Sequence, residues 1–337
     1  MKKHFKTLYA PLFLIPLFCA LGTLLLGRIQ VSPGDMLSVL QGLVFGTDTG
    51  VDPQTALIIR EIRLPRAFIG LLVGASLAAS GAAFQGLFCN PLVNSGILGV
   101  SSGAGFGAAL AIILFGRGNE VFAFAFLFGC LAVSMSYLVG KVYRTTSTVM
   151  LVLGGVVVSS IFSALLSFLK YVADPYDQLP AITFWLMGSL ASISSGVVFA
   201  AAIPMLIGLG GLWLFRWRLN VLSMGDQEAQ ALGVNVPLTK GLIIACATLA
   251  TAGAVCISGI IGWVGLIIPH ICRMLFGSDN KIIVPASSCF GGAFLVIVDT
   301  IARTLTGSEI PLGIITAILG GPFFIYLLKK TKGGGIG

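Results

Sequence analysis

Residues 64–84 read LPRAFIGLLVGASLAASGAAF, and this stretch decides the class of fold. It carries a single charged residue, Arg66, and is long enough to cross the hydrocarbon core of a bilayer as a helix. Small residues recur along it at intervals of four, at Gly70, Gly74, Ala78 and Ala82. Such a stripe lets a second helix approach closely, so the stretch predicts a packed transmembrane helix.

The composition extends this prediction to the whole chain of 337 residues. Hydrophobic residues make up 57% and charged residues 9%, and the mean hydropathy is +1.02, which excludes a soluble globular protein. The net charge of +8 does not indicate nucleic-acid binding, because no basic segment interleaved with aromatic residues occurs. The seven cysteines lie mostly in apolar runs and are expected to be buried thiols, not disulfides.

Ten apolar segments predict an all-α polytopic membrane protein in which residues 1–337 form a single domain. They are residues 8–27, 64–84, 95–115, 121–142, 147–170, 196–215, 239–259, 263–276, 282–304 and 311–328. The first has no small-residue cleavage site and is expected to be a helix, not a signal peptide. Segment 263–276 is short and contains Pro269, so it requires burial within protein.

The distribution of basic residues predicts that both termini are cytoplasmic. Ten crossings place thirteen of the 20 Lys and Arg residues on the side of the termini and seven on the other side. An excess of Lys and Arg marks the cytoplasmic side of a membrane protein.

A weak internal repeat relates two of the segments. Residues 75–82 read ASLAASGA and residues 247–254 read ATLATAGA, five crossings apart, so the two halves have inverted topology. Inverted repeats are typical of transporters, including transporters driven by ion gradients. Small-residue helices also resemble one another by composition alone.

Residues 219–240 are expected to form a cytoplasmic loop that contains a short helix between Gly225 and Gly233. Asp226 is suited to cap this helix and Gly233 to end it. A helix of about seven residues is unstable alone, so it must dock, either on its own bundle or on a soluble partner.

Arg60, Arg63 and Arg66 lie on the outer side, against the usual charge bias. They are expected either to reach lipid headgroups or to bind carboxylates of a docking protein. Arg303 lies four residues after Asp299 and is spaced to pair with it on one helix.

Polar links between helices offer candidates for a constriction, namely Asn90 before Pro91 and the hydroxyl side chains of residues 145–148. Both also fit simple turns and helix caps. His270 is expected to be structural, and no metal site or catalytic set of residues is predicted. The sequence contains no Gly-x-x-x-x-Gly-Lys-Ser/Thr phosphate loop, so hydrolysis of ATP is expected from another subunit.

Three blocks of sequence together resemble the FecCD family, the permeases of ABC importers for iron–siderophore complexes, haem and cobalamin. They are residues 63–103, which include RLPR, NPLV and LGVSSG, then residues 225–233, then residues 262–313, which include GWVGLIIPH and EIPLG. The resemblance implies a type II ABC importer permease fold and a multi-pass homodimer in the bacterial inner membrane. Two cytoplasmic ABC ATPases would use ATP and Mg, a periplasmic binding protein would deliver cargo, and this chain would be no enzyme and hold no cofactor.

The resemblance also implies roles for individual residues. The ATPase-coupling helix would comprise Gly225, Asp226, Glu228, Ala229, Leu232 and Gly233, and the binding protein would dock on Arg63, Arg66 and Arg303. The inner gate would use Asn90, Leu92, Thr146, Ser147 and Thr148. Within the family the chain looks like permeases for molybdate or tungstate, while iron–siderophore, haem and cobalamin remain alternative cargoes.

Overall fold

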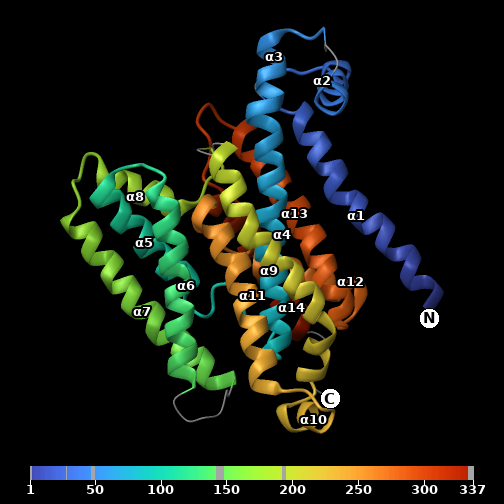
Figure 1. Ribbon diagram of the computed structural model, residues 1–337, viewed down its shortest axis with the longest axis vertical. Helices are drawn as coiled ribbons and strands as arrows, with labels where there is room; N and C mark the ends of the chain where they lie inside the picture. The colour runs from blue at the N-terminus through green and yellow to red at the C-terminus, as the bar shows by residue number, and fades with distance from the viewer. Residues whose placement is uncertain (1, 28, 47–49, 142–147, 192–194, 333–337) are drawn as a thin grey trace.

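The computed structural model describes residues 2–27, 29–46, 50–141, 148–191 and 195–332, and the regular structure within these ranges is helical (Figure 1). All ten predicted segments correspond to helices. They are α1 (Lys2–Leu25), α4 (Leu64–Leu87), α5 (Val100–Phe115), α6 (Glu120–Gly140), α7 (Thr148–Val172), α9 (Ser195–Leu222), α11 (Val236–Ser258), α12 (Val264–Phe276), α13 (Asn280–Thr304) and α14 (Leu312–Lys332). Among the described residues, six helical stretches are long and apolar enough to cross a membrane, and four shorter apolar helices accompany them.

Helices outside these segments cover the ends of the bundle: α2 (Pro33–Phe45), α3 (Pro53–Leu57), the π-helical turn η1 (Ile58–Arg63), α8 (Gln178–Met187) and α10 (Asp226–Ala231). Capping explains where α2 and α3 begin. Ser32 Oγ accepts a hydrogen bond from the Asp35 amide at 3.0 Å, and the Asp52 carboxylate accepts one from the Thr55 amide at 3.0 Å. Proline follows each cap, at the position where its missing N–H costs nothing.

Helix α4 lies at the centre and packs against α9, α11, α12 and α13. Its small residues allow this, as predicted. Gly74 lies against the backbone of Gly291 in α13, and Gly81 lies against the backbone of Gly265 in α12, so closely that a Cβ atom at either position would overlap the facing carbonyl.

Helices α5, α6, α7 and α8 form a second group at the left of Figure 1. Gly103 and Gly107 of α5 lie against the α6 carbonyl groups of Phe128 and Phe124, so glycine again serves helix packing. Gly99 has a different role: its backbone is left-handed, with φ of +89°, and it is the residue from which the helix starts. Helix α5 therefore begins at Val100 and not at residue 95.

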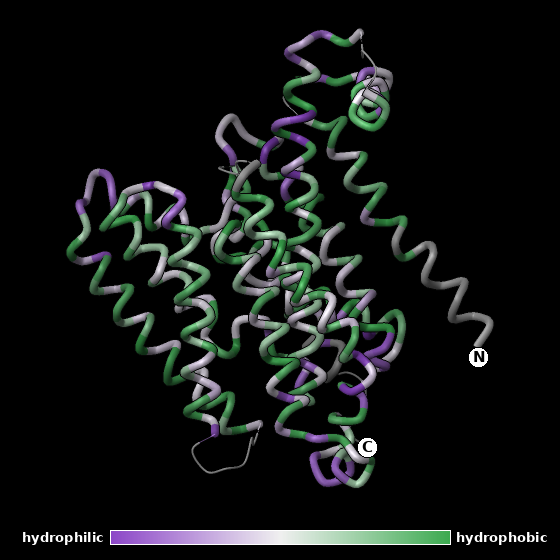
Figure 2. Tube along the Cα trace, in the orientation of Figure 1, coloured by the Kyte–Doolittle hydropathy of each residue, from purple (hydrophilic) through white to green (hydrophobic). Residues whose placement is uncertain are grey.

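The two repeat segments meet in space. The Ser80 hydroxyl in α4 donates to the Ala247 carbonyl in α11 at 3.1 Å. The two helices run in opposite directions, α4 starting at the end of the bundle that carries α3 and α11 starting at the end that carries α10 (Figure 1). We call these the α3 end and the α10 end; hydrophilic segments gather at both (Figure 2).

Candidate functional site

Helix α10 projects from the α10 end with little contact to the rest of the bundle (Figure 1). It has six residues and buries only Ala229. The side chains of Gln227, Glu228, Gln230, Ala231 and Leu232 are exposed. Of the six predicted coupling residues, Asp226, Glu228 and Ala229 therefore lie in α10, and Gly225, Leu232 and Gly233 flank it. The helix offers a mainly polar surface for docking.

Both glycines that flank α10 have backbone angles that favour glycine, with φ of +122° at Gly225 and +79° at Gly233. Gly233 ends the helix as predicted. The prediction that Asp226 caps it is wrong, because Gly225 occupies the cap position and no side chain bonds there. The Asp226 carboxylate instead accepts from Lys240 Nζ at 2.8 Å, and the buried Lys240 ties α10 to α11.

The α4–α5 link, residues 88–99, contains the predicted gate residues Asn90 and Leu92. Asn90 Oδ1 accepts from the Leu92 amide at 2.9 Å, which makes the Asn-Pro pair a compact turn. Leu92 is 58% exposed, and its side chain is free to face a passage or a partner. Thr148 is the half-exposed first residue of α7, whereas Thr146 and Ser147 lie outside the described residues.

No role was predicted for Gln85, which holds this link in place. Gln85 lies in the last turn of α4 and is 2% exposed. Its Nε2 donates to the Val93 carbonyl at 3.0 Å, and its Oε1 accepts a hydrogen bond from Arg273 of α12. The contact with Arg273 spans 188 residues, so no local pattern could reveal it.

A cluster at the α3 end contains the three predicted docking residues, Arg63, Arg66 and Arg303. The Arg66 guanidinium bonds two carboxylates at once: Nη2 lies 2.8 Å from Asp299 Oδ1 and 2.9 Å from Glu309 Oε2. Arg66 thereby joins α4 to α13 and to the α13–α14 connection. The predicted pair of Arg303 with Asp299 is present at 3.9 Å, longer than the unpredicted contact with Arg66.

Arg63 and Arg303 hold the end of α1. Arg63 donates to the carbonyls of Leu24 and Ile29, and Arg303 Nη2 donates to the Thr23 carbonyl and hydroxyl, both at 2.6 Å. These carbonyls belong to a helix C-terminus and the turn after it, where positive charge is favourable. None of the three arginines extends freely into solvent, as a simple docking prediction requires.

The cluster still faces a hollow of about 250 Å³ on the surface. The residues that line it are Gly27, Ile29, Ile58, Ile62, Arg63, Arg66, Arg303 and Glu309. The three guanidinium groups outnumber the two carboxylates, Asp299 and Glu309, and Arg303 Nε is buried without a hydrogen-bond partner. The hollow therefore has an excess of positive charge that suits an entering carboxylate.

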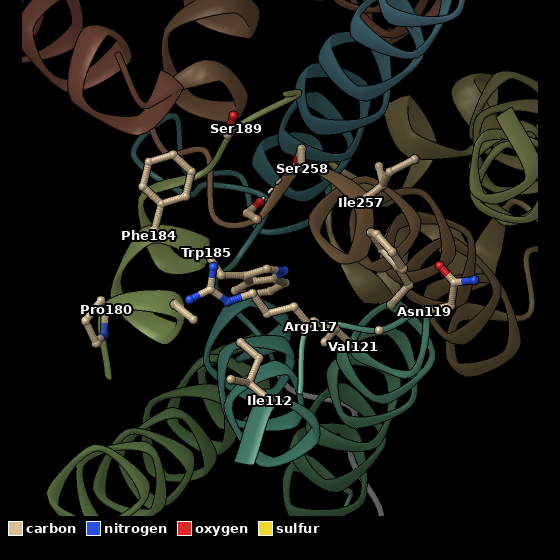
Figure 3. A pocket seen from close by; sticks show the side chains of 14 residues that line it. Ile112, Arg117, Asn119, Val121, Pro180, Phe184, Trp185, Ser189, Ile257 and Ser258 are labelled. Atoms are coloured by element: carbon tan, nitrogen blue, oxygen red, sulfur yellow. Dashed lines mark hydrogen bonds between the residues drawn. The ribbon is translucent and has the colours of Figure 1, made fainter. Parts of the chain in front are cut away.

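A larger pocket of about 640 Å³ lies between the α5–α6 loop, α8 and the end of α11 (Figure 3). Trp185 and Phe184 form part of its wall, and Ser189 and Asn119 supply polar groups. Arg117 on its rim donates to Asp177 at 2.7 Å and so connects two loops. None of the predicted coupling, docking or gate residues that the structure describes lines this pocket.

No group of three or more His, Cys, Asp or Glu side chains that could hold a metal occurs in the described part of the chain.

Known transport permeases resemble this chain over most of its length. The sequence model of the FecCD transport family matches residues 13–330. The chain is 39% identical, over 96% of both chains, to the molybdate import system permease protein MolB of Haemophilus influenzae. It is 42% identical to a probable iron chelatin transport system permease protein of Helicobacter pylori, over 82% of this chain and 84% of the relative.

A solved metal-chelate type ABC transporter in an inward-facing conformation shares the fold. The TM-score is 0.85 at 38% sequence identity, and the match covers 96% of this chain and 99% of the other. A family match over nearly the whole length, together with this fold, decides the assignment: the chain belongs to the FecCD transport family and is an ABC importer permease.

Proposed function

We propose that this permease moves its cargo into the cytoplasm by alternating access, driven by two separate ABC ATPases that bind at α10. The observation that carries the proposal is the geometry of α10, which has six residues, buries one, and projects at the end where the α4–α5 link lies. Such a short helix gains stability by docking on a partner. ATP and Mg would be used by the ATPases, and this chain would supply the path.

Replacing residues 225–233 by a Gly/Ser linker of equal length tests this proposal. Co-purification of the ATPase should be lost while the melting temperature of the permease falls only slightly, because the linker also removes the ion pair of Asp226 with Lys240. A sharper version is Leu232→Glu, with Leu305→Glu at the α3 end as control, since these leucines are 62% and 68% exposed. Unchanged association of the ATPase with both α10 variants would refute the docking role.

The proposed orientation places the α10 end and both termini in the cytoplasm of a bacterium and the α3 end outside its inner membrane. The asymmetry of thirteen against seven Lys and Arg residues supports it. Cys89 on the α4–α5 link is exposed and provides a probe. It should react with an impermeant maleimide in inverted vesicles and not in intact spheroplasts; the reverse pattern would invert the orientation.

We propose further that a homodimer receives cargo from a periplasmic binding protein, whose carboxylates enter the hollow at Arg63, Arg66 and Arg303. Mutation of these arginines would break the internal cluster, so a neighbouring residue gives a cleaner test. Ile62→Glu adds negative charge to the hollow and should weaken capture of the loaded binding protein at least tenfold. Leu57→Glu, at a similarly exposed site on α3, is the control.

The proposed cargo is molybdate or tungstate. The MolB relative supports this because it matches over 96% of the chain, against 82% for the iron chelatin relative. Iron–siderophore, haem and cobalamin are the alternatives. Thermal-shift measurements on the cognate binding protein decide among them: stabilisation by molybdate and by no ferric chelate, haem or cobalamin is expected, and the opposite selectivity would overturn the cargo assignment.

A transporter driven by an ion gradient is the candidate from another class, and the inverted arrangement of α4 and α11 is compatible with it. Such a mechanism uses ionisable groups inside the membrane. The buried Asp299 bonds to Arg66, which leaves it poorly suited to exchange ions.

A further inference from the structure

Gln85 has an unusual position for an amide side chain. It is almost fully buried at the end of a helix that is otherwise rich in Ala, Gly, Ser and Leu. Buried polar groups are kept where their hydrogen bonds are satisfied, and Gln85 uses both ends of its amide. The donor end reaches the link through Val93, and the acceptor end reaches α12 through Arg273.

The amide also approaches the start of α12 directly. Nε2 lies 3.4 Å from the Gly265 carbonyl and 3.5 Å from the Leu266 carbonyl. Arg273 also approaches the Ala82 carbonyl, at 3.5 Å. One side chain therefore joins the end of α4, the middle of the link and both ends of α12.

The same turn of α4 contacts the start of α13, which in turn bonds the end of α9, the helix that leads to α10. Asn220, in the last turn of α9, donates from Nδ2 to Asp279 Oδ1 at 2.6 Å and accepts from the Asn280 amide at 2.8 Å. The Asn280 side chain lies on Gly86, where a Cβ atom would be 3.0 Å from its Oδ1. Gly86 is the residue next to Gln85.

A second contact reaches the link from the same side. Cys89 has a left-handed backbone with φ of +49°, and its thiol lies 3.7 Å from the Ser223 carbonyl, two residues before Gly225. The α4–α5 link is thus placed between Gln85 and the residues that precede α10.

We propose that Gln85 is a positioning residue of the inner gate: it fixes the α4–α5 link to α12, so that movement of α10 is passed to the link through the end of α9 and the start of α13. This inference rests on the proposed function, since it requires α10 to move with the ATPases. Contact alone does not demonstrate coupling, so the test measures coupling itself.

The test uses the complete transporter, with ATPases and binding protein, in proteoliposomes. Gln85→Leu removes both ends of the amide, and Gln85→Glu keeps an acceptor for Arg273 while losing the donor to Val93. Gln178→Leu is the matched control, because Gln178 also donates to a backbone carbonyl, that of Ile113 at 3.4 Å, but lies in α8. Two quantities are measured: cargo transported per ATP hydrolysed, and the labelling rate of Cys89 with maleimide, resolved by peptide mass spectrometry.

In the wild type, Cys89 labelling should differ at least threefold between the nucleotide-free and the vanadate-trapped complex. Both Gln85 variants should retain ATP hydrolysis, transport at least tenfold less cargo per ATP, and lose most of this nucleotide dependence at Cys89. Gln178→Leu should behave as wild type.

Three results would overturn the inference. They are wild-type coupling in both Gln85 variants, a parallel fall of hydrolysis and transport that marks a merely structural role, and Cys89 labelling in the wild type that ignores nucleotide. If Gln85→Leu fails to assemble, Gln85→Glu still decides the matter. Failure of the proposed function is distinct, because the wild-type complex would then show no ATP-driven uptake.

Discussion

The two ends of the bundle are held together by different chemistry. At the α3 end, charged groups join α1, α4, α13 and the α13–α14 connection, with Arg66 bonded to both Asp299 and Glu309. At the α10 end, the link between α4 and α5 is held through the neutral amides of Gln85 and Asn220, which bond to the Val93 carbonyl, the Arg273 guanidinium and the Asp279 carboxylate. Breaking a buried cluster of ion pairs costs more than breaking hydrogen bonds to a neutral amide, so the α3 end is built to stay fixed and the α10 end can rearrange.

Arg66→Met gives the largest expected effect, because it leaves the two carboxylates Asp299 and Glu309 without the guanidinium that joins them. Loss of one partner from a buried ion pair costs about 3–5 kcal/mol. The variant should show a markedly lower melting temperature in detergent. A melting temperature equal to that of the wild type would show that the cluster does not hold the α3 end together.

Gln85→Leu should destabilise the protein less, by about 1–2 kcal/mol, which is the value of a hydrogen bond between membrane helices. Melting temperatures of the two variants under identical conditions check the order. A larger fall in melting temperature for Gln85→Leu than for Arg66→Met would show that the α10 end, not the α3 end, is the more firmly held.

Asp226→Asn removes the ion pair with Lys240 that holds α10 against α11. The Asp226 side chain is 47% exposed, and the asparagine oxygen can still accept a hydrogen bond from the buried Lys240, so we expect a loss of about 1 kcal/mol. The stability of the bundle should barely change, while ATPase binding should weaken about fivefold in a titration, because α10 is less well oriented. Binding that is unchanged would show that Lys240 does not orient α10.

Arg117→Met should give the smallest loss of stability. It compares an exposed salt bridge with the buried cluster at the same end of the bundle, the α3 end. Its salt bridge with Asp177 is 2.7 Å long, as short as those of the buried cluster, but the two side chains are 66% and 75% exposed. Exposed pairs contribute about 0–1 kcal/mol. A loss of stability as large as that of Arg66→Met would mean that the contact between the loops around the 640 Å³ pocket stabilises the fold as much as the buried cluster does.

The bundle was predicted well from the sequence because each transmembrane segment can be recognised from the length of its own apolar run. The packing role of Gly74 was also predicted from local spacing. The helices α2 and α3 were missed although Ser32-Pro33 and Asp52-Pro53 carry the usual signals of a helix start.

The candidate site was predicted less completely, because its partners lie far apart in the chain. The spacing of four residues correctly predicted that Asp299 pairs with Arg303. The shorter ion pair of Asp299, however, is with Arg66, 233 residues away in the chain. Asp226 fits the pattern of a helix cap, yet its carboxylate forms an ion pair with Lys240. Such long-range contacts decide the roles of polar side chains inside a bundle, and periodicity does not show them.

The central claim is that this chain supplies the path and a separate ATPase supplies the energy. It is tested most directly by cargo uptake in proteoliposomes that contain the permease with or without the ATPase, at fixed ion gradients, with ATP supplied on the α10 side. Uptake should require both ATP and the ATPase and should disappear when residues 225–233 are replaced by a linker. Uptake that persists without nucleotide and responds to the ion gradient would contradict the account.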